Sequence, residues 1–145
     1  MNEKDVVAFE QHGRIARLIN QTKNKLVSDV EKDLEPFGVS VAQFLILFML
    51  WSGRCDTASE LCKEICYSAG TMTRVLDRLE QRRLIRRYPH PASRRAHLLN
   101  VTDEGRELFA LMHKRVAVNI DRSFGKLDLA DIVLLEGLLT RILAH

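Results

Sequence analysis

The sequence predicts a mainly α-helical fold with one small β-hairpin. Apolar residues recur at helical spacing over most of the 145 residues. Side chains that commonly cap helices precede these segments at Ser40, Thr57, Ser68, Thr102 and Asp128. A pair of β-compatible runs lies within residues 84–101, on either side of a proline-containing connection. We therefore expect a helical protein in which a single hairpin is inserted between helices.

The first predicted helix covers residues 5–34. Its apolar residues follow spacings of four, seven, four and four along the chain: Ile15, Ile19, Leu26, Val30 and Leu34. Pro36 and Gly38 stop this pattern. A helix of this length measures about 45 Å at roughly 1.5 Å per residue. That length is unusual for a small monomeric protein.

Three shorter helices are predicted next. Ser40-Val-Ala-Gln43 and Thr57-Ala-Ser-Glu60 match the capping-box pattern. The first opens a helix that ends at Gly53, and the second opens a helix over residues 58–66. Ser68 caps a third helix that runs to about residue 83. The last two helices meet at a tight joint, which predicts a helix-turn-helix.

The predicted strands, Leu84–Tyr88 and Ala96–Val101, follow directly. Pro89 and Pro91 lack amide donors and favour an exposed, extended connection between the strands. A helix-turn-helix followed by such a hairpin is a winged helix. Thr102 then opens a helix to about residue 123, and Asp128 opens a last helix after the break at Gly125.

The last helix carries an apolar stripe of Ile132, Leu135, Leu138, Leu139, Ile142 and Leu143. This is more apolar surface than a 145-residue monomer easily hides. We expect residues 1–35 and 103–145 to form a helical dimerisation region, in which the terminal helices pack together and against a second subunit. Residues 36–102 would form the winged helix-turn-helix, in one structural domain per subunit. The alternative is that the stripe is buried within one chain.

The positive charge is concentrated in one segment. Residues 67–102 carry eight arginines and two carboxylates, whereas the rest of the chain has a net charge of −3. Such an asymmetry indicates an anionic partner that docks at one place, since a solvated face usually mixes its signs. The segment lies on the predicted helix-turn-helix and hairpin. Double-stranded DNA is the partner that this combination favours.

Individual side chains in this segment fit DNA recognition. Thr71, Arg74 and Arg78 lie at i, i+3 and i+7, opposite the apolar face of their helix, and Thr73 lies beside them. Arginine and threonine in this position suit the major groove. The alternative is a solvated face, with Asp77 and Glu80 pairing the arginines along the helix.

The hairpin adds further basic residues. Adjacent strand residues Arg86 and Arg87 point to opposite faces, so one faces DNA and the other faces the body of the protein or a cleft. Arg94 and Arg95 lie at the tip, where they would enter a minor groove. His90 is a possible phosphate donor. A solvated loop is the alternative for this tip.

Several other functions are disfavoured. The N-terminal residues do not resemble a secretory signal, and the apolar run Phe44–Trp51 spans eight residues where a membrane span needs about 20. We therefore expect a cytoplasmic protein that does not enter a membrane. We find no catalytic or nucleotide-binding motif and expect no enzymatic activity, no cofactor and no metal. The three cysteines indicate free thiols rather than disulfides.

The residues resemble those of the MarR family, bacterial winged-helix repressors named for multiple antibiotic resistance. The resemblance covers almost the whole chain. It is carried by "RIARLINQTKNKL", "VSVAQFLIL", "SAGTMTRVLDRLEQRRLIRRYPHPASRR" and "LLNVTDEG". It implies a homodimer on a pseudo-palindromic operator, and repression that is usually relieved by a small aromatic or phenolic anion.

The resemblance also assigns residues. Thr73, Arg74 and Arg78 match recognition-helix contacts, Arg95 matches the wing-tip arginine, and Gln43 and Arg87 match supporting contacts. Together with the residues chosen above, the predicted DNA-binding set is Gln43, Ser68, Thr71, Thr73, Arg74, Arg78, Arg87, Arg94 and Arg95. In the family, the effector usually lies between the dimerisation helices and the winged helix. The matching lining residues are His12, Ile15, Phe44, Leu47, Met49 and Arg87.

The sequence departs from the family pattern at the wing, where Ser93 replaces the usual carboxylate before the arginines. We expect a less firmly held tip, with greater nonspecific affinity and salt sensitivity. Two alternatives to a ligand-released repressor remain. The chain could be a thiol- or metal-responsive regulator that uses Cys62 and Cys66, which are spaced i, i+4 on one predicted helix. It could also use its winged helix for protein interaction alone.

Overall fold

The computed structural model describes residues 2–144. Its elements are α1 (Glu3–Leu34), the short 3-10 helix η1 (Glu35–Phe37), α2 (Val41–Trp51), α3 (Ala58–Ile65), α4 (Ala69–Gln81), β1 (Ile85–His90), β2 (Ser93–Val101), α5 (Asp103–Phe124) and α6 (Leu129–Leu143). The predicted class, mainly helical with one antiparallel hairpin, is confirmed. Met1 and His145, the outer limits of the predicted terminal regions, lie outside the described residues.

Side-chain caps determine where the helices begin. Ser40 Oγ accepts from the Gln43 amide at 3.2 Å, and Gln43 Oε1 accepts from the Ser40 amide at 3.0 Å, which completes the predicted capping box. Thr57 Oγ1 accepts from the Glu60 amide at 3.3 Å, but the Glu60 carboxylate accepts from the Asp56 amide instead of that of Thr57. The second predicted capping box is therefore only half formed. The remaining predicted caps are present: Ser68, Thr102 and Asp128.

Some predicted helix limits were wrong by one or two residues. The helix-turn-helix joint begins one residue early because Cys66 adopts a left-handed conformation, with φ of 59°. α4 ends at Gln81 rather than at residue 83, and Arg83 adopts φ of 60° in the turn that follows. The first helix starts at Glu3 rather than at residue 5 because Asn2 caps it.

The hairpin is longer than predicted. Its register runs from Ile85 opposite Val101 to Pro89 opposite His97, and an irregularity follows between Pro89 and His90. Pro89 therefore lies inside β1 rather than in the connection. A two-stranded sheet accommodates it because each strand has an edge where a missing amide donor costs no pairing.

The core is formed by the winged helix together with parts of the outer helices. Val30 and Leu34 at the end of α1, and Phe109, Met112 and Val116 of α5, are buried with it. The largest fully buried side chains are Phe109, Leu34, Ile46, Leu47, Leu61, Met72, Leu76, Leu79, Ile85 and Met112. Segments on both sides of residues 36–102 thus complete the core of that region.

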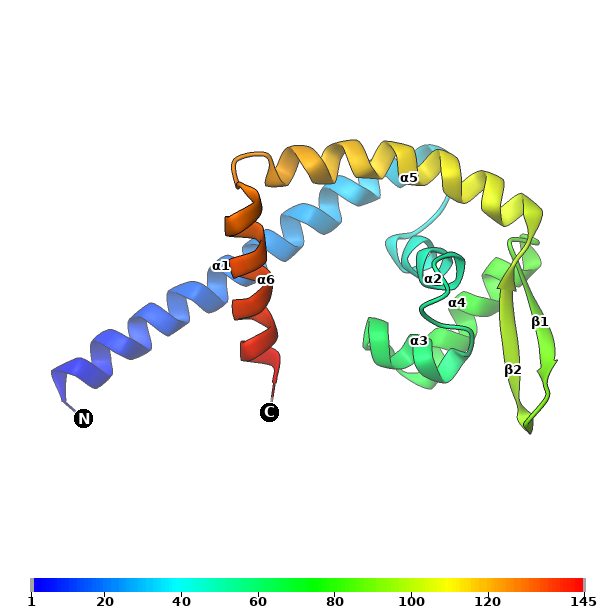
Figure 1. Ribbon diagram of the computed structural model, residues 1–145, viewed down its shortest axis with the longest axis horizontal. Helices are drawn as coiled ribbons and strands as arrows, with labels where there is room; N and C mark the ends of the chain where they lie inside the picture. Colours follow the sequence, from blue (N-terminus) through cyan, green and yellow to red (C-terminus); the bar gives the residue numbers. More distant parts are fainter. Residues whose placement is uncertain (1, 145) are drawn as a thin grey trace.

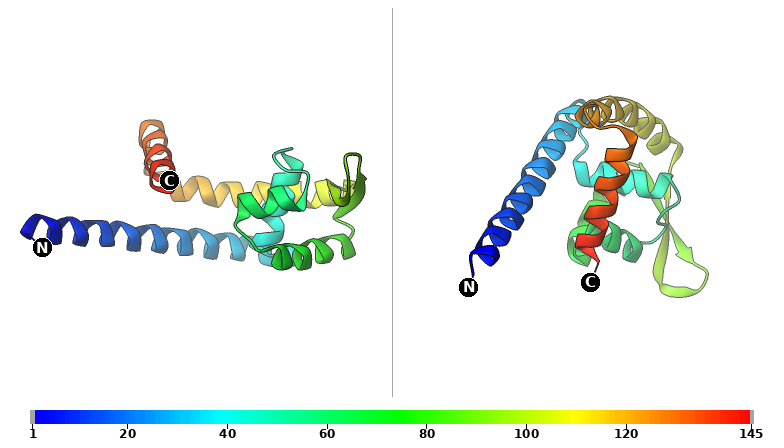
Figure 2. Two further views of the ribbon diagram at one scale, coloured as in Figure 1. Left: turned by 90° about the horizontal axis from the view of Figure 1, so that it is seen from below. Right: turned by 60° about the vertical axis from the view of Figure 1, so that its left-hand side comes forward.

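The terminal helices lie largely outside this core. Figure 1 shows α5 as the top of an arch, with α1 and α6 descending at one end and the winged helix hanging from the other. Figure 2 shows α6 projecting away from α1. Within the chain α1 packs against α5, where Asn119 donates to the Asp33 carboxylate at 2.6 Å. The predicted packing of the terminal helices against a second subunit stays a prediction.

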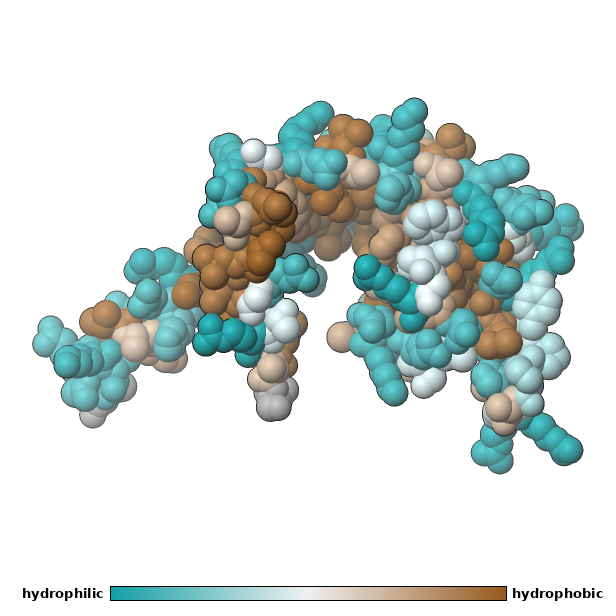
Figure 3. All heavy atoms as spheres, in the orientation of Figure 1, coloured by the Kyte–Doolittle hydropathy of each residue, from teal (hydrophilic) through white to brown (hydrophobic). Residues whose placement is uncertain are grey.

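Apolar side chains are exposed along both terminal helices. Leu129 and Leu143 are each 77% exposed, and Phe9 is also 77% exposed. α6 contains no buried residue, and Figure 3 shows a hydrophobic patch over this helix. Intrachain burial of the apolar stripe, the alternative considered from sequence, is therefore contradicted.

Across residues 2–144, no single helix has the length and apolar character needed to cross a membrane. The segments 3–37 and Val41–Trp51 reach that length and composition as a pair, but they are bent by 85° at the break between them.

Candidate nucleic-acid interface

α4 presents a polar face outward because its opposite face is buried. Met72, Leu76 and Leu79 fill the core, while Thr73, Arg74 and Arg78 are exposed. Since these two sets alternate at helical spacing, burial of the apolar set fixes the direction in which the arginines project.

The first turn of α4 is held by hydroxyl groups. Ser68 Oγ accepts from the Thr71 amide at 3.2 Å and lies 3.0 Å from Thr71 Oγ1. The Thr73 hydroxyl donates to the Ala69 carbonyl at 2.9 Å, which leaves its methyl group and an oxygen lone pair free for a partner. Ser68 and Thr71 thus position the helix start, and Thr73 presents a contact surface.

Arg87 connects the wing to α4. Its Nη2 lies 2.9 Å from Asp77 Oδ1, and its Nη1 lies 2.7 Å from Glu80 Oε2. The two carboxylates of α4 therefore pair with the wing. The solvated-face alternative required them to pair with arginines of their own helix, and they do not. Among residues 2–144, Arg74 and Arg78 take part in no ion pair.

Arg86 and Arg87 lie on opposite faces of β1, as predicted. Arg87 lines a cleft of about 700 Å³ between the start of α3, α4 and the wing, and this cleft is also lined by Thr73 and Arg95. Arg86 instead lines a hollow on the other side of the wing. α4 and the tip of the wing thus border one common cleft.

The wing tip is organised by side-chain acceptors. Ser93 Oγ accepts from the amides of Arg95 at 3.3 Å and Ala96 at 3.4 Å. His90 Nδ1 accepts from the Ala92 amide at 3.0 Å. The Ser93 hydroxyl thus makes turn hydrogen bonds of the kind a carboxylate would make. Both tip arginines, Arg94 and Arg95, are exposed. The expected looser tip stays a prediction.

Two further polar side chains, one of them in the predicted DNA-binding set, make hydrogen bonds inside the chain. Gln43 is buried, and its side chain completes the cap of α2. Arg82 donates to the carbonyls of Gly38 at 2.8 Å and Phe37 at 3.1 Å, and thus ties the end of α4 to the connection before α2. Both residues support the position of the helix-turn-helix.

The predicted effector-lining residues are not brought together within one chain. His12 and Ile15 lie on the exposed half of α1. Phe44 and Leu47 fill the core, Met49 packs against that core, and Arg87 lies on the wing.

An aromatic cluster between α2 and α5 was missed by the sequence reasoning. Phe109 stacks on Phe44 at a centroid distance of 5.5 Å and contacts Trp51 at 5.1 Å, and His113 extends the cluster at 5.5 Å from Phe109. Trp51 is 46% exposed. The helical spacing of aromatic residues in each helix was visible, but the pairing of two helices about 60 positions apart was not.

The cysteines occupy three different environments. Burial raises the pKa of the Cys55 thiol, with carboxylates such as Glu60 adding to the effect. Cys62 packs against the core, while Cys66 is exposed. The prediction that Cys62 and Cys66 share one helix was wrong, because Cys66 is the left-handed cap that ends α3.

These features define a winged helix-turn-helix DNA-binding protein. α4 is seated by an apolar inner face and presents arginines outward, and it borders a hairpin whose tip carries two further arginines. A sequence profile of the MarR family matches residues 39–97. The multiple antibiotic resistance protein MarR of Escherichia coli K12 is 31% identical over 132 residues, which cover 90% of each chain. The chain belongs to the MarR family and is a transcriptional regulator of that family.

Solved structures agree with this assignment. A mutant of E. coli MarR complexed with operator DNA superposes with a TM-score of 0.82 at 28% identity, covering 94% of this chain and 98% of that one. Bordetella bronchiseptica BpsR superposes with a TM-score of 0.77 at 25% identity, covering 90% of this chain and 99% of that one.

Proposed function

We propose that the chain is a homodimeric repressor that binds a pseudo-palindromic operator and is released by a small aromatic or phenolic anion. The observation that carries this proposal is the pair of exposed arginines on α4, neither of which forms an ion pair among residues 2–144, beside a wing tip with two more. The operator complex of E. coli MarR, a protein of the same fold and family, supports it.

Each recognition helix would enter a major groove. Arg74 and Arg78 would donate to guanine edges or phosphates, and Thr73 would contact a base edge or a thymine methyl. Arg94 and Arg95 would enter the neighbouring minor groove, where the negative potential is concentrated. The two half-sites would lie about one helical turn apart.

Dimerisation would cover the apolar surface of the terminal helices. α6 and the first half of α1 expose leucine, isoleucine, valine and phenylalanine side chains that one chain leaves in water. Burying such surface contributes about 25 cal/mol per Å². A second copy presents the same surface, so a two-fold contact between these helices satisfies both chains at once.

The proposed effector is an anion with an aromatic ring. DNA binding by BpsR is regulated by 6-hydroxynicotinic acid, which is such an anion. In this chain, His12 and Ile15 could join Met49 and the core aromatic residues only across a dimer, since α1 carries them away from its own winged helix. The effector would act by preferring a dimer whose winged helices are spaced unsuitably for DNA.

The test begins with a duplex obtained by selecting random DNA for binding to the full chain. Fluorescence anisotropy at several salt concentrations should show tight binding that weakens as salt rises. Arg95→Ala should reduce the slope of log affinity against log salt by about one, whereas Lys114→Ala, at an exposed position of α5 beside the end of α1, should leave it unchanged. Failure to enrich any sequence, even at low salt, would contradict the DNA-binding proposal.

Release is tested with the same duplex. Titration with 6-hydroxynicotinate and benzoate should lower DNA affinity and quench or shift the emission of Trp51, the single tryptophan. Acetate is the matched control for an anion without a ring. Equal effects of acetate and the aromatic acids would contradict an aromatic effector. A reporter gene behind the selected site should be silenced by the chain, and activation would contradict the repressor role.

A further inference from the structure

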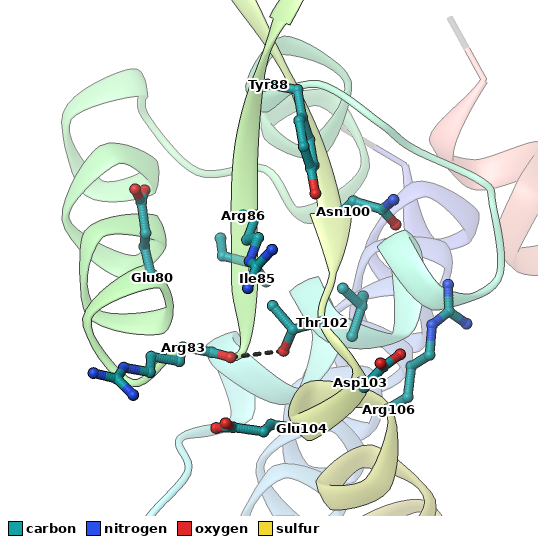
Figure 4. Close-up of a pocket in the computed structure, with 11 residues that line it drawn as sticks. Glu80, Arg83, Ile85, Arg86, Tyr88, Asn100, Thr102, Asp103, Glu104 and Arg106 are labelled. Atoms are coloured by element: carbon teal, nitrogen blue, oxygen red, sulfur yellow. Dashed lines mark hydrogen bonds between the residues drawn. The ribbon is translucent and has the colours of Figure 1, made fainter.

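The outer side of the wing base carries a charged surface that DNA recognition does not use. A hollow of about 780 Å³ lies where the end of α4, the hairpin and the start of α5 meet. Its polar lining includes Arg83, Arg86, Tyr88, Asp103, Glu104 and Arg106, which we call the wing-base surface. Figure 4 shows these side chains at the mouth of the hollow.

The wing-base surface has a rigid backbone. The Thr102 hydroxyl donates to the Arg83 carbonyl at 2.6 Å, and the Thr102 amide donates to the Leu84 carbonyl at 3.0 Å. A Cβ on Gly105 would overlap the Leu84 carbonyl oxygen, so only glycine allows α5 to approach this closely. The charged side chains are thus mounted on a fixed junction rather than on a flexible loop.

The charges of the wing-base surface are not neutralised within the chain. Over residues 2–144, none of its three arginines or two carboxylates takes part in an ion pair. All five are exposed, as is Tyr88. The carboxylates Asp103 and Glu104 disfavour DNA phosphate as the partner. Mixed charges around an exposed tyrosine instead suit a protein surface with mixed charges of its own.

The position of the wing-base surface indicates which protein would present such a partner surface. In Figure 1 the wing lies at the end of the arch opposite the free ends of α1 and α6. In Figure 4 the hollow faces the viewer, and α6 lies at the right-hand edge of the view, away from the labelled side chains. If dimers form through the terminal helices, the wing-base surfaces become the two outermost ends of the dimer along the DNA.

We propose that two dimers bound to neighbouring operators contact each other through their wing-base surfaces and bind cooperatively. This inference rests on the proposed function. Two identical dimers on the same side of DNA are related at their contact by a local two-fold axis, so each surface meets a copy of itself. Such a contact requires opposite charges on the two flanks of one surface.

The wing-base surface offers one such pair. Figure 4 shows Arg83 on one flank of the wing and Asp103 on the other, while Glu104 lies on the Arg83 side and Arg106 lies beside Asp103. A two-fold axis exchanges the flanks, so Arg83 of each copy approaches Asp103 of the other. The contact contains two such pairs, and exposed pairs contribute modestly each. A cooperativity of roughly tenfold is expected at low salt, decreasing as salt screens the charges.

The experiment compares selected duplexes that contain one or two copies of the bound site. The centres of the two sites are moved apart in steps of about half a helical turn, or about 5 bp. When the two sites lie on the same side of the DNA, the wild-type chain should bind the second site about tenfold more tightly than it binds a single site. When they lie on opposite sides, the two affinities should be equal.

Charge reversal then locates the contact. Arg83→Asp and Asp103→Arg should each abolish cooperativity while leaving single-site affinity within about twofold, and the double variant R83D/D103R should restore it. Aspartate tolerates the left-handed backbone at position 83. Lys114→Asp makes the same charge change as Arg83→Asp, at an exposed position of α5 that does not line the wing-base hollow, and should keep full cooperativity. Thermal melts confirm that each variant is folded.

The outcomes separate this inference from the proposed function. Loss of binding to the one-site duplex by the wild-type chain would contradict the proposed function. Normal single-site binding without phase-dependent cooperativity would overturn the inference alone. Cooperativity that survives both reversals, or that is lost equally in the Lys114 variant, would also overturn it.

Discussion

Leucine side chains are buried in the winged helix but exposed in the C-terminal helix α6. Leu61 and Leu79 of the winged helix are completely buried, whereas Leu129 and Leu143 of α6 are 77% exposed. Fully burying a leucine side chain contributes about 1.5–3 kcal/mol relative to leaving it in water. One region therefore gains its hydrophobic stabilisation within a single chain, whereas the other would gain it only from the proposed second copy.

This difference separates the part of the regulator that contacts DNA from the part that would set the spacing of two DNA-binding regions. The shape that reads DNA is complete in one chain, since the caps, the core and the Arg87 bridge are all internal. In the proposed dimer, the distance between two such shapes would be set by the terminal helices, whose packing would depend on a second copy. A ligand that altered this dimer would therefore change operator binding without disturbing either winged helix.

The largest expected effect comes from breaking the terminal region. Leu138→Asp places a charge in the apolar stripe of α6, where Leu138 is 43% exposed in one chain. Desolvating that charge in a dimer should raise the dimer dissociation constant by roughly 100-fold or more. Analytical ultracentrifugation measures this shift, and operator affinity should fall with it. Thr140→Asp, on the polar side of α6, is the control and should remain dimeric.

A substitution in the winged-helix region should destabilise the fold while leaving α6 untouched. Gly105→Ala forces a Cβ against the Leu84 carbonyl, and we expect a loss of about 2–3 kcal/mol in the free energy of unfolding. Gly70→Ala in α4 meets no atom within 4 Å and should be neutral or slightly stabilising. Urea titration provides both values. Equal stability of the two variants would contradict the tight junction at the wing base.

Local chemistry made most of the fold predictable. Ser40, Ser68, Thr102 and Asp128 each cap a helix within their own turn, so the helix starts could be identified without knowledge of tertiary structure. Helix ends were less accurate. Arg83 adopts a left-handed conformation that is uncommon for a non-glycine residue, so nothing in the sequence marked the end of α4 there.

The candidate site was predictable where exposure follows from helical spacing, as for Arg74 and Arg78. It was not predictable where distant segments meet. Pairing of Asp77 and Glu80 with arginines along α4 was the alternative considered for this helix, but their partner is Arg87 from the wing. Such partners depend on how elements pack, which residue spacing alone does not encode.

A smaller effect is expected on the reading surface of the winged helix. Arg74→Ala should weaken operator binding by about 1–3 kcal/mol and relax base preference at one position of each half-site if Arg74 contacts a guanine. Competition with duplexes mutated at single positions measures both effects. The folding stability and the dimer dissociation constant should stay at wild-type values, because Arg74 is exposed and has no ion pair among the described residues. A change in either would mean that the two regions are not separate at this position.

The smallest expected effect concerns the bridge between α4 and the wing. Arg87→Lys keeps the charge but replaces a planar fork that reaches Asp77 and Glu80 together with a single ammonium. The ion pairs are partly exposed, so the cost in folding free energy should stay below about 1 kcal/mol. Operator affinity should nevertheless fall a few-fold, because the wing tip is no longer held at a fixed angle to α4. Arg86→Lys, on the opposite face of β1, is the matched control, and an equal loss of affinity in both variants would show that total wing charge, rather than the bridge, determines binding.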